Sequence, residues 1–170
     1  MDLKYYVRNI RDFPQKGILF KDITPLLQSP KGFRLAVKKL AACIAPLKPD
    51  AITGIEARGF LFASPVAYCL GVSLIPVRKP GKLPLKTRTV SYDLEYGKDA
   101  VEVHTDAIKQ GQRVVVVDDL LATGGTMSAT VNLLEQIGAE IAGIAVVIEL
   151  TELKGRDRVN GYDVFSLIKY

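Results

Sequence analysis

Four consecutive valines, at positions 114–117, constrain the fold of this chain more than any other stretch. Apolar and polar residues do not alternate here, so a strand at this position is apolar on both faces. Such a strand is typical of the centre of a parallel sheet that lies between two layers of helices. Segments with strand and helix patterns alternate along the rest of the chain. This order predicts an α/β fold with a central, mostly parallel sheet flanked by helices on both faces.

The residues that follow the valines predict a site for a phosphorylated sugar. Asp118 and Asp119 come where the strand is expected to end, and open α/β sheets hold ligands at that end of their strands. Two adjacent carboxylates repel each other unless a cation or hydroxyl donors compensate, and sugar hydroxyls could do so. Residues 122–126, ATGGT, then offer backbone N–H groups, two hydroxyls and the start of a helix predicted over 126–137, whose dipole favours an anion. A buried strand followed by a solvated turn is the alternative.

A second turn suits an anion as well. A strand predicted over residues 50–55 ends in the sequence EARG at 56–59, ahead of an apolar helix predicted over 60–70. Arg58 and the nearby backbone amides could bind an anion at this corner. The alternative is that Glu56 and Arg58 form a solvated pair in an ordinary turn.

A third turn carries three cations. A strand predicted over residues 72–77 leads to Arg78, Lys79 and Lys82, which surround a rigid Pro-Gly turn. At the same edge of the sheet they would neutralise a polyphosphate, whereas elsewhere they would be an ordinary surface turn.

The segment from Asp118 to Thr126 does not match two common nucleotide-binding loops. It is not a Walker loop, because no lysine follows its glycines, and it is not a dinucleotide-binding loop, because GxGxxG is absent.

The remaining segments are less informative, with one exception. Residues 83–98 lack a buried pattern, and we expect a long hairpin with its turn near Gly97, of the kind that often serves as a lid. Glu95 would meet a substrate only when such a lid closes. A short helix is expected over residues 2–12, and the irregular segment 13–25 carries two phenylalanines that are either core plugs or stacking platforms. Further helices are predicted over 31–46 and 152–158, and further strands over 141–148 and 162–168.

Length and composition fit one soluble domain. The chain has 170 residues, of which 48% are hydrophobic, and it contains no apolar run long enough to span a membrane. The charged N-terminal stretch differs from a secretory signal, so we expect a cytoplasmic protein. Cys43 and Cys69 lack metal-ligand spacing, and His104 stands alone. The formal net charge of +5 is spread along the chain, and it suits a small anionic ligand as well as it suits nucleic acid.

Four stretches carry a resemblance to a known family. The string VVVVDDLLATGGTM at 114–127 resembles the phosphoribosyl pyrophosphate signature of type I phosphoribosyltransferases. PQKGILFKDITPLL at 14–27, GIEARGFLFA at 54–63, and VRKPGKLP with YDLEYG between 77 and 97 resemble the adenine phosphoribosyltransferases of that family. Together the stretches cover nearly the whole chain.

The resemblance implies a fold and a reaction. The fold is the type I phosphoribosyltransferase fold, a single domain over residues 1–170 with an N-terminal hood at about 1–30 and a flexible β-hairpin flap at about 83–100. The reaction joins adenine to 5-phosphoribosyl-1-pyrophosphate with Mg²⁺ and gives AMP and pyrophosphate in purine salvage. A homodimer is implied, with no direct protein ligand to the metal, which the substrate and water would hold. Neither a specific nucleic acid nor a membrane is implied as a partner.

The resemblance also implies roles for individual residues. The phosphoribosyl group and AMP would be held by Asp118, Asp119, Ala122, Thr123, Gly124, Gly125 and Thr126. Pyrophosphate would be bound by Glu56, Ala57, Arg58, Lys79 and Lys82, with the lysines reaching it across a dimer interface. Adenine would be bound by Leu19, Phe20 and Lys21, with the Phe20 ring stacked on the base and backbone groups at 19 and 21 on its edge. Glu95 would exchange a proton with adenine N7, Tyr96 would close the site, and Arg58 would share the catalytic role with Glu95. Many relatives have Arg where this chain has Lys21, which keeps the charge but lacks the planar fork of a guanidinium.

Two other functions compete with this one. The first is a phosphoribosyltransferase for another base, such as hypoxanthine, xanthine or orotate, and residues 14–27 favour adenine over these. The second is a non-catalytic, phosphoribosyl pyrophosphate-sensing regulator of a nucleic-acid-binding kind. Such regulators usually need an extra DNA-binding module, and we expect no room for one ahead of the hood.

Overall fold

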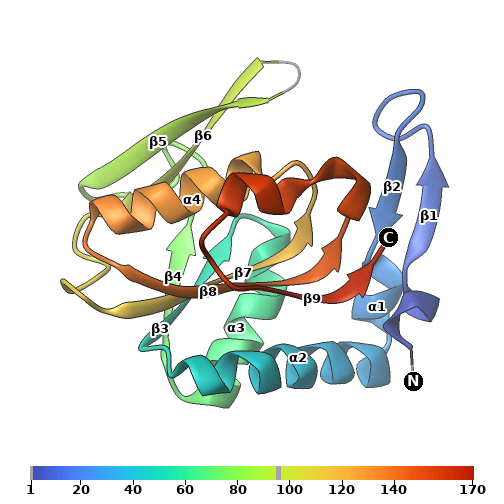
Figure 1. Ribbon diagram of the computed structural model, residues 1–170, viewed down its shortest axis with the longest axis horizontal. Helices are drawn as coiled ribbons and strands as arrows, with labels where there is room; N and C mark the ends of the chain where they lie inside the picture. Colours follow the sequence, from blue (N-terminus) through green and yellow to red (C-terminus); the bar gives the residue numbers. More distant parts are fainter. Residues whose placement is uncertain (1, 95–96) are drawn as a thin grey trace.

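The computed structural model describes residues 2–94 and 97–170. A five-stranded, all-parallel sheet forms its centre (Figure 1). In spatial order its strands are β4 (Ser73–Val77), β3 (Ala51–Ile55), β7 (Arg113–Leu121), β8 (Glu140–Glu149) and β9 (Val164–Lys169). The predicted central strand is therefore confirmed as β7. It is longer than expected, because it continues past both aspartates and still pairs with β8 at Leu121.

The four valines divide their side chains between two apolar cores. Val115 and Val117 pack with the helices α2 (Pro30–Ile44) and α3 (Arg58–Leu70) on one face of the sheet, and Val114 and Val116 pack with α4 (Gly125–Gln136) on the other. Figure 1 shows α4 on one side of the sheet and α2 and α3 on the opposite side. All four valines are fully buried. The prediction of a sheet with helices on both faces is confirmed.

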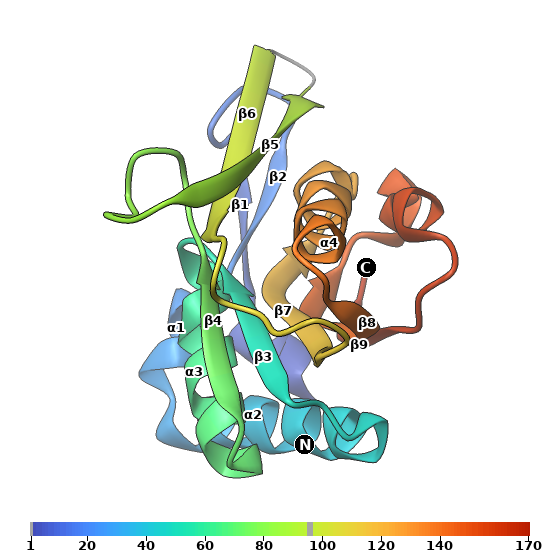
Figure 2. The same cartoon turned by 90° about the vertical axis from the view of Figure 1, so that its left-hand side faces the viewer.

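Two antiparallel hairpins stand at the same end of the molecule (Figure 2). One consists of β1 (Arg8–Arg11) and β2 (Leu19–Asp22), and the other of β5 (Thr87–Leu94) and β6 (Gly97–His104). The second confirms the expected hairpin, although it starts later than residue 83 and extends beyond residue 98. Its connection, which contains Glu95 and Tyr96, lies outside the described residues.

Two predictions of secondary structure were wrong. The helix expected over residues 2–12 is only a 3₁₀ turn, η1 (Leu3–Tyr6), because β1 follows it and pairs with β2. The short helix expected over 152–158 is two 3₁₀ turns, η3 (Thr151–Leu153) and η4 (Gly155–Val159). These turns are separated at Lys154, whose backbone φ of +52° is left-handed and interrupts a regular helix.

The remaining elements are the short helix α1 (Thr24–Gln28) and the 3₁₀ turn η2 (Ala45–Leu47). Among the helices of the described part of the chain, none combines the length and apolarity needed to cross a membrane. The peptide bonds Phe13–Pro14 and Glu56–Ala57 are cis.

Candidate active site

A cavity of about 280 Å³ lies at the carboxyl ends of β3 and β7. Its walls come from four parts of the chain that are far apart in sequence. They are the turn after β3, the end of β7 with the loop before α4, Lys79 after β4, and two side chains of the β5–β6 hairpin. The lining residues are Ile55, Glu56, Ala57, Arg58, Lys79, Tyr92, Asp99 and the continuous run from Asp118 to Met127. Ligands of open α/β sheets bind at this edge.

The loop at residues 122–126 is shaped by two glycines that touch. Gly124 caps α4 with a backbone φ of +81°, a conformation that disfavours any other residue. A β-carbon on Gly124 would lie 2.4 Å from the carbonyl oxygen of Gly155, and one on Gly155 would lie 2.3 Å from that of Ala122. The turn at η4 therefore packs directly against the backbone of the loop at residues 122–126. The loop leads directly into the N-terminal turn of α4, where free backbone N–H groups favour an anion.

Asp118, which is half-buried, and Asp119, which is buried, form a carboxylate pair in the wall of the cavity. The Asp119 N–H donates to Asp118 Oδ1 over 2.8 Å, and Arg58 Nε lies 2.9 Å from Asp119 Oδ2. That contact is an ion pair without hydrogen-bond alignment, so among the described residues the buried Oδ2 atom has no hydrogen-bond partner. Burial, and then the charge of Asp119, raise the pKa of Asp118 well above its usual range. A ligand hydroxyl would supply the missing donor and stabilise the ionised pair.

The corner before α3 brings Arg58 to the same cavity. The helix α3 begins at Arg58, and Gly59 follows because a β-carbon there would lie 2.8 Å from Asp118 Oδ1. Glu56 lines the cavity too, and it also binds the neighbouring basic turn. Its carboxylate accepts a hydrogen bond of 2.9 Å from the Lys79 backbone N–H and two from the Arg78 guanidinium, at 3.1 and 3.2 Å. These bonds, that from Lys79 first, lower the pKa of Glu56, and they attach the basic turn to the corner.

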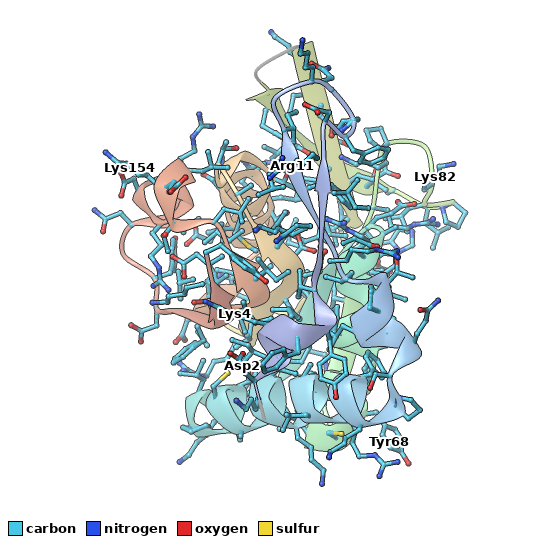
Figure 3. The ribbon with its side chains drawn as sticks, turned by 90° about the vertical axis from the view of Figure 1, so that its right-hand side faces the viewer. Asp2, Lys4, Arg11, Tyr68, Lys82 and Lys154 are labelled. Carbon is cyan, nitrogen blue, oxygen red and sulfur yellow. The ribbon has the colours of Figure 1, made fainter. Side chains whose placement is uncertain are left out.

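The structure separates the two lysines of the basic turn. Lys79 lines the cavity of its own chain, whereas Lys82 is exposed and lies outside the cavity lining. Figure 3 shows Lys82 at the outer edge of its loop. Buried Glu102 fixes this loop by accepting hydrogen bonds from the backbone N–H groups of Lys82 and Leu83, at 3.0 and 3.1 Å. Of the two residues, the geometry thus brings only Lys79 to the site.

Two site residues were missed by the sequence analysis. Tyr92 of β5 and Asp99 of β6 face each other across the hairpin and line the cavity. The Tyr92 hydroxyl donates to Asp99 Oδ2 over 2.9 Å, and it accepts hydrogen bonds from Lys79 Nζ and Thr126 Oγ1, both at 3.1 Å. Lys79 also pairs directly with Asp99. The cross-strand register of the hairpin would have been the one signal that places these two side chains together.

The β1–β2 hairpin places an aromatic ring next to the cavity. The ring centroid of Phe20 lies 5.2 Å from Cζ of Arg58, a cation–π distance. Phe13 packs edge-on against Phe20, with 5.1 Å between the ring centroids. Phe20 is therefore held beside the predicted anion site, and Leu19 next to it is exposed.

Lys21 does not point its side chain at the cavity. Its Nζ atom donates to Asn9 Oδ1 over 2.8 Å and lies 3.6 Å from the ring centroid of Tyr170. The side chain is buried, and burial is the main cause that lowers its pKa. Lys21 thus connects the hairpin to the C-terminal residue. Glu95 and Tyr96 lie outside the described residues, so their predicted roles stay predictions.

Comparison with known proteins agrees with this arrangement. The family model of the phosphoribosyl transferase domain matches residues 24–170. Adenine phosphoribosyltransferase from Clostridium perfringens is 59% identical over 170 residues, which cover 100% of this chain and 99% of that protein. The chain belongs to the adenine phosphoribosyltransferase family. The resemblance found from the four sequence stretches is confirmed.

Solved structures of the family have the same fold. The adenine phosphoribosyltransferase of Thermoanaerobacter pseudethanolicus superimposes with a TM-score of 0.96 at 53% identity, over 99% of this chain and 98% of that one. The Saccharomyces cerevisiae enzyme gives 0.91 at 40% identity, over 97% and 96% of the chains, and its crystal contains adenine and an imino-altritol bisphosphate. The predicted type I phosphoribosyltransferase fold is therefore confirmed.

Proposed function

We propose that this protein transfers the phosphoribosyl group of 5-phosphoribosyl-1-pyrophosphate to adenine and releases AMP and pyrophosphate. One observation carries the proposal. A single cavity joins a carboxylate pair, a glycine loop at a helix N-terminus and two cations, and Phe20 lies beside it. These are the groups that a ribose, a 5′-phosphate, a pyrophosphate and a purine each require. The family relationship supports the same reaction, since the relatives at 59% and 55% identity carry this activity in their names.

The carboxylate pair and the glycine loop would hold the phosphoribosyl group. Asp118 and Asp119 would accept hydrogen bonds from the ribose hydroxyls, which would satisfy the buried Asp119 Oδ2 atom. The backbone N–H groups at residues 122–126 would surround the 5′-phosphate at the start of α4. Both contacts fix the anomeric carbon relative to the base and the leaving group.

Arg58 and Lys79 would stabilise the leaving pyrophosphate. Displacement at the anomeric carbon passes through an oxocarbenium-like state, in which negative charge develops on the pyrophosphate oxygens. Fixed cations at that position lower the barrier because they need no reorganisation during the reaction. The ion pair between Arg58 and Asp119 supports this role, because it holds the guanidinium next to the carboxylates proposed to bind the ribose.

The base would lie against the β1–β2 hairpin. Phe20 would stack on adenine, and backbone groups of Leu19 and Lys21 would read its edge. Adenine attacks through N9 and must lose a proton, so a carboxylate that shares a proton with N7 would assist. We assign this task to Glu95, with Tyr96 closing the site against water.

Mg²⁺ fits this site as a companion of the substrate. Carboxylate oxygens are suitable donors, and Asp119 offers one buried oxygen without a hydrogen-bond partner in the described structure. No group of three or more His, Cys, Asp or Glu side chains within residues 2–94 and 97–170 could hold an ion. The substrate and water would therefore supply its ligands, and Asp118 and Asp119 would favour the cation by their charge without binding it directly. When bound, Mg²⁺ neutralises pyrophosphate charge.

We further propose that residues 1–170 form one domain that works as a homodimer. Apolar side chains are exposed on α3 and the edge strand β4, namely Leu61, Tyr68 and Leu74, and Tyr68 is 88% exposed (Figure 3). A partner on this side would cover them and would give the exposed Lys82 a route to a second site. We place the reaction in the cytoplasm, because its phosphorylated substrate and product are polyanions that do not cross a bilayer. Light scattering at assay concentrations measures the oligomeric state, and a monomer would contradict the dimer.

A base-specificity assay tests the proposed function. Adenine, hypoxanthine and guanine are compared as acceptors of the phosphoribosyl group, with formation of the nucleotide as the readout. We expect AMP formation with adenine, and preferred use of a 6-oxopurine would refute the assignment. Glu95→Gln should reduce turnover far more than affinity for phosphoribosyl pyrophosphate, by about 10²–10⁴-fold if general acid–base help is lost. Normal turnover in that variant would remove Glu95 from the mechanism.

A further inference from the structure

The β5–β6 hairpin contributes a carboxylate to the cavity that should receive anions. Asp99 lies on β6 directly opposite Tyr92 on β5, and both side chains line the cavity together with Lys79. Asp99 Oδ2 accepts hydrogen bonds from Lys79 Nζ and from the Tyr92 hydroxyl, and Oδ1 accepts one of 2.8 Å from the Ala100 N–H. The carboxylate is therefore fully engaged and is held in one place.

The donors around Asp99 are those expected at a phosphate subsite. Lys79 supplies an ammonium group, and Tyr92 supplies a hydroxyl that in turn receives a hydrogen bond from Thr126 Oγ1. Thr126 belongs to the loop that is assigned to the 5′-phosphate. One hydrogen-bonded chain thus connects the hairpin, the basic turn and the glycine loop across the cavity.

The charges of Lys79 and Asp99 indicate that Asp99 competes with a ligand anion for Lys79. Burial opposes the charge on Lys79, but the hydrogen bonds that its ammonium group donates to Asp99 and Tyr92 outweigh burial and raise the lysine pKa. Burial would likewise raise the pKa of Asp99, yet the Lys79 hydrogen bond reverses this and lowers it. Both groups are charged at neutral pH, so the positive charge of Lys79 is already neutralised by its own chain. An incoming phosphoryl oxygen must displace the Asp99 carboxylate from the Lys79 ammonium group. It then lies close to this carboxylate, whose negative charge repels it.

We propose that Asp99 binds Lys79 in the position that a ligand phosphoryl group would take, and that it thereby sets the affinity of the site for pyrophosphate. Asp99 is a positioning residue that acts through Lys79, and the inference rests on the proposed function only for the identity of the anion. A merely structural Asp99, which holds Lys79 ready for the ligand, would have the opposite effect on affinity.

Calorimetric titration with inorganic pyrophosphate in the presence of MgCl₂ tests the proposal. Asp99→Asn keeps the size of the side chain and removes its charge, and Asp99→Ala removes the carboxylate in a second way. Asp106 is an exposed aspartate outside the cavity lining, so Asp106→Asn is a control for the change in net charge. Thermal melting of each variant checks folding. We expect both Asp99 variants to bind pyrophosphate about 3–10-fold more tightly than the wild type, and Asp106→Asn to bind as the wild type does.

A double-mutant cycle with Lys79→Met separates competition from other effects. If Asp99 acts through Lys79, Asp99→Asn changes pyrophosphate affinity much less in the Lys79→Met background, where only the direct repulsion by the carboxylate is left. Unchanged or weaker binding by folded Asp99→Asn and Asp99→Ala would overturn the proposal, as would equal tightening in the presence and absence of Lys79. A wild-type chain that binds pyrophosphate but makes no AMP from adenine would refute the proposed function instead, and the Asp99 comparison would still decide the inference.

Discussion

Gly155→Ala tests whether the turn at η4 fixes the glycine loop. The added β-carbon would lie 2.3 Å from the carbonyl oxygen of Ala122 and 3.1 Å from the backbone nitrogen of Gly124, whereas real β-carbons essentially never approach below 3.0 Å. The loop or the turn must therefore move by at least 0.7 Å, the difference between 3.0 and 2.3 Å. The backbone φ of Gly155 is not positive, so close contacts exclude a side chain here and backbone conformation does not.

The displacement falls on backbone groups that are assigned to the 5′-phosphate. A misplacement of about 1 Å can cost up to ~10²-fold in rate, so we expect KM for phosphoribosyl pyrophosphate to rise about 10–100-fold. Overpacking should also lower the free energy of unfolding by about 1–3 kcal/mol. Steady-state kinetics measure the first effect, and urea unfolding measures the second.

Gly143→Ala is a matched control within β8. A β-carbon there would lie 2.9 Å from Cδ1 of Leu47, which is the end of a flexible side chain rather than backbone, and Gly143 does not line the cavity. This variant should lose stability without a change in KM. If Gly155→Ala also leaves KM unchanged, or if Gly143→Ala raises it equally, the loop is not positioned by η4 as described.

Three further variants test stability and base binding. Glu149→Gln should lower the urea midpoint at pH 7, because hydrogen bonds, that from Arg156 first, lower the pKa of Glu149 from 4.5 to about 2, a contribution of at most about 3 kcal/mol. This stability is present above pH 4.5 and is lost as the pH falls towards 2, so the urea midpoints of the wild type and the variant should converge at low pH. A difference between the midpoints that stays constant with pH would show that the Glu149 carboxylate is not its cause. Asp118→Asn should raise the urea midpoint at pH 7 while AMP binding is lost, since burial and Asp119 raise the pKa of Asp118 and make its ionised form unfavourable in the fold. A lower midpoint would show that the pair stabilises the fold. Phe20→Leu should raise KM for adenine about 5–150-fold, the loss of about 1–3 kcal/mol of stacking, with KM for phosphoribosyl pyrophosphate unchanged. Equal effects on both KM values would exclude stacking.

The centre of the fold was predictable because it depends on local patterns. Four adjacent valines require apolar surroundings on both faces, and the structure divides them between the α2–α3 core and the α4 core. The carboxylate pair, the glycine loop and Arg58 follow directly from the ends of buried strands. Their meeting in one cavity needs only the rule that parallel strands end at a common edge.

The features that sequence reasoning missed depend on pairing between distant segments. β1 and β2 are four-residue, mostly polar strands that find each other across a loop, so neither has an apolar period of its own. Asp99 reaches Lys79 over 20 residues only because the hairpin returns to the basic turn. Lys82 lies outside the cavity of its own chain, where Glu102 fixes its loop, and its predicted reach into a partner's site stays a prediction.

A crystal structure with AMP tests the central claim most directly. The proposed function predicts the 5′-phosphate on the backbone N–H groups of residues 122–126, the ribose hydroxyls on Asp118 and Asp119, and the purine against the ring of Phe20. A phosphate bound elsewhere, for example between Arg58 and Lys79 with the ribose away from the carboxylate pair, would contradict it.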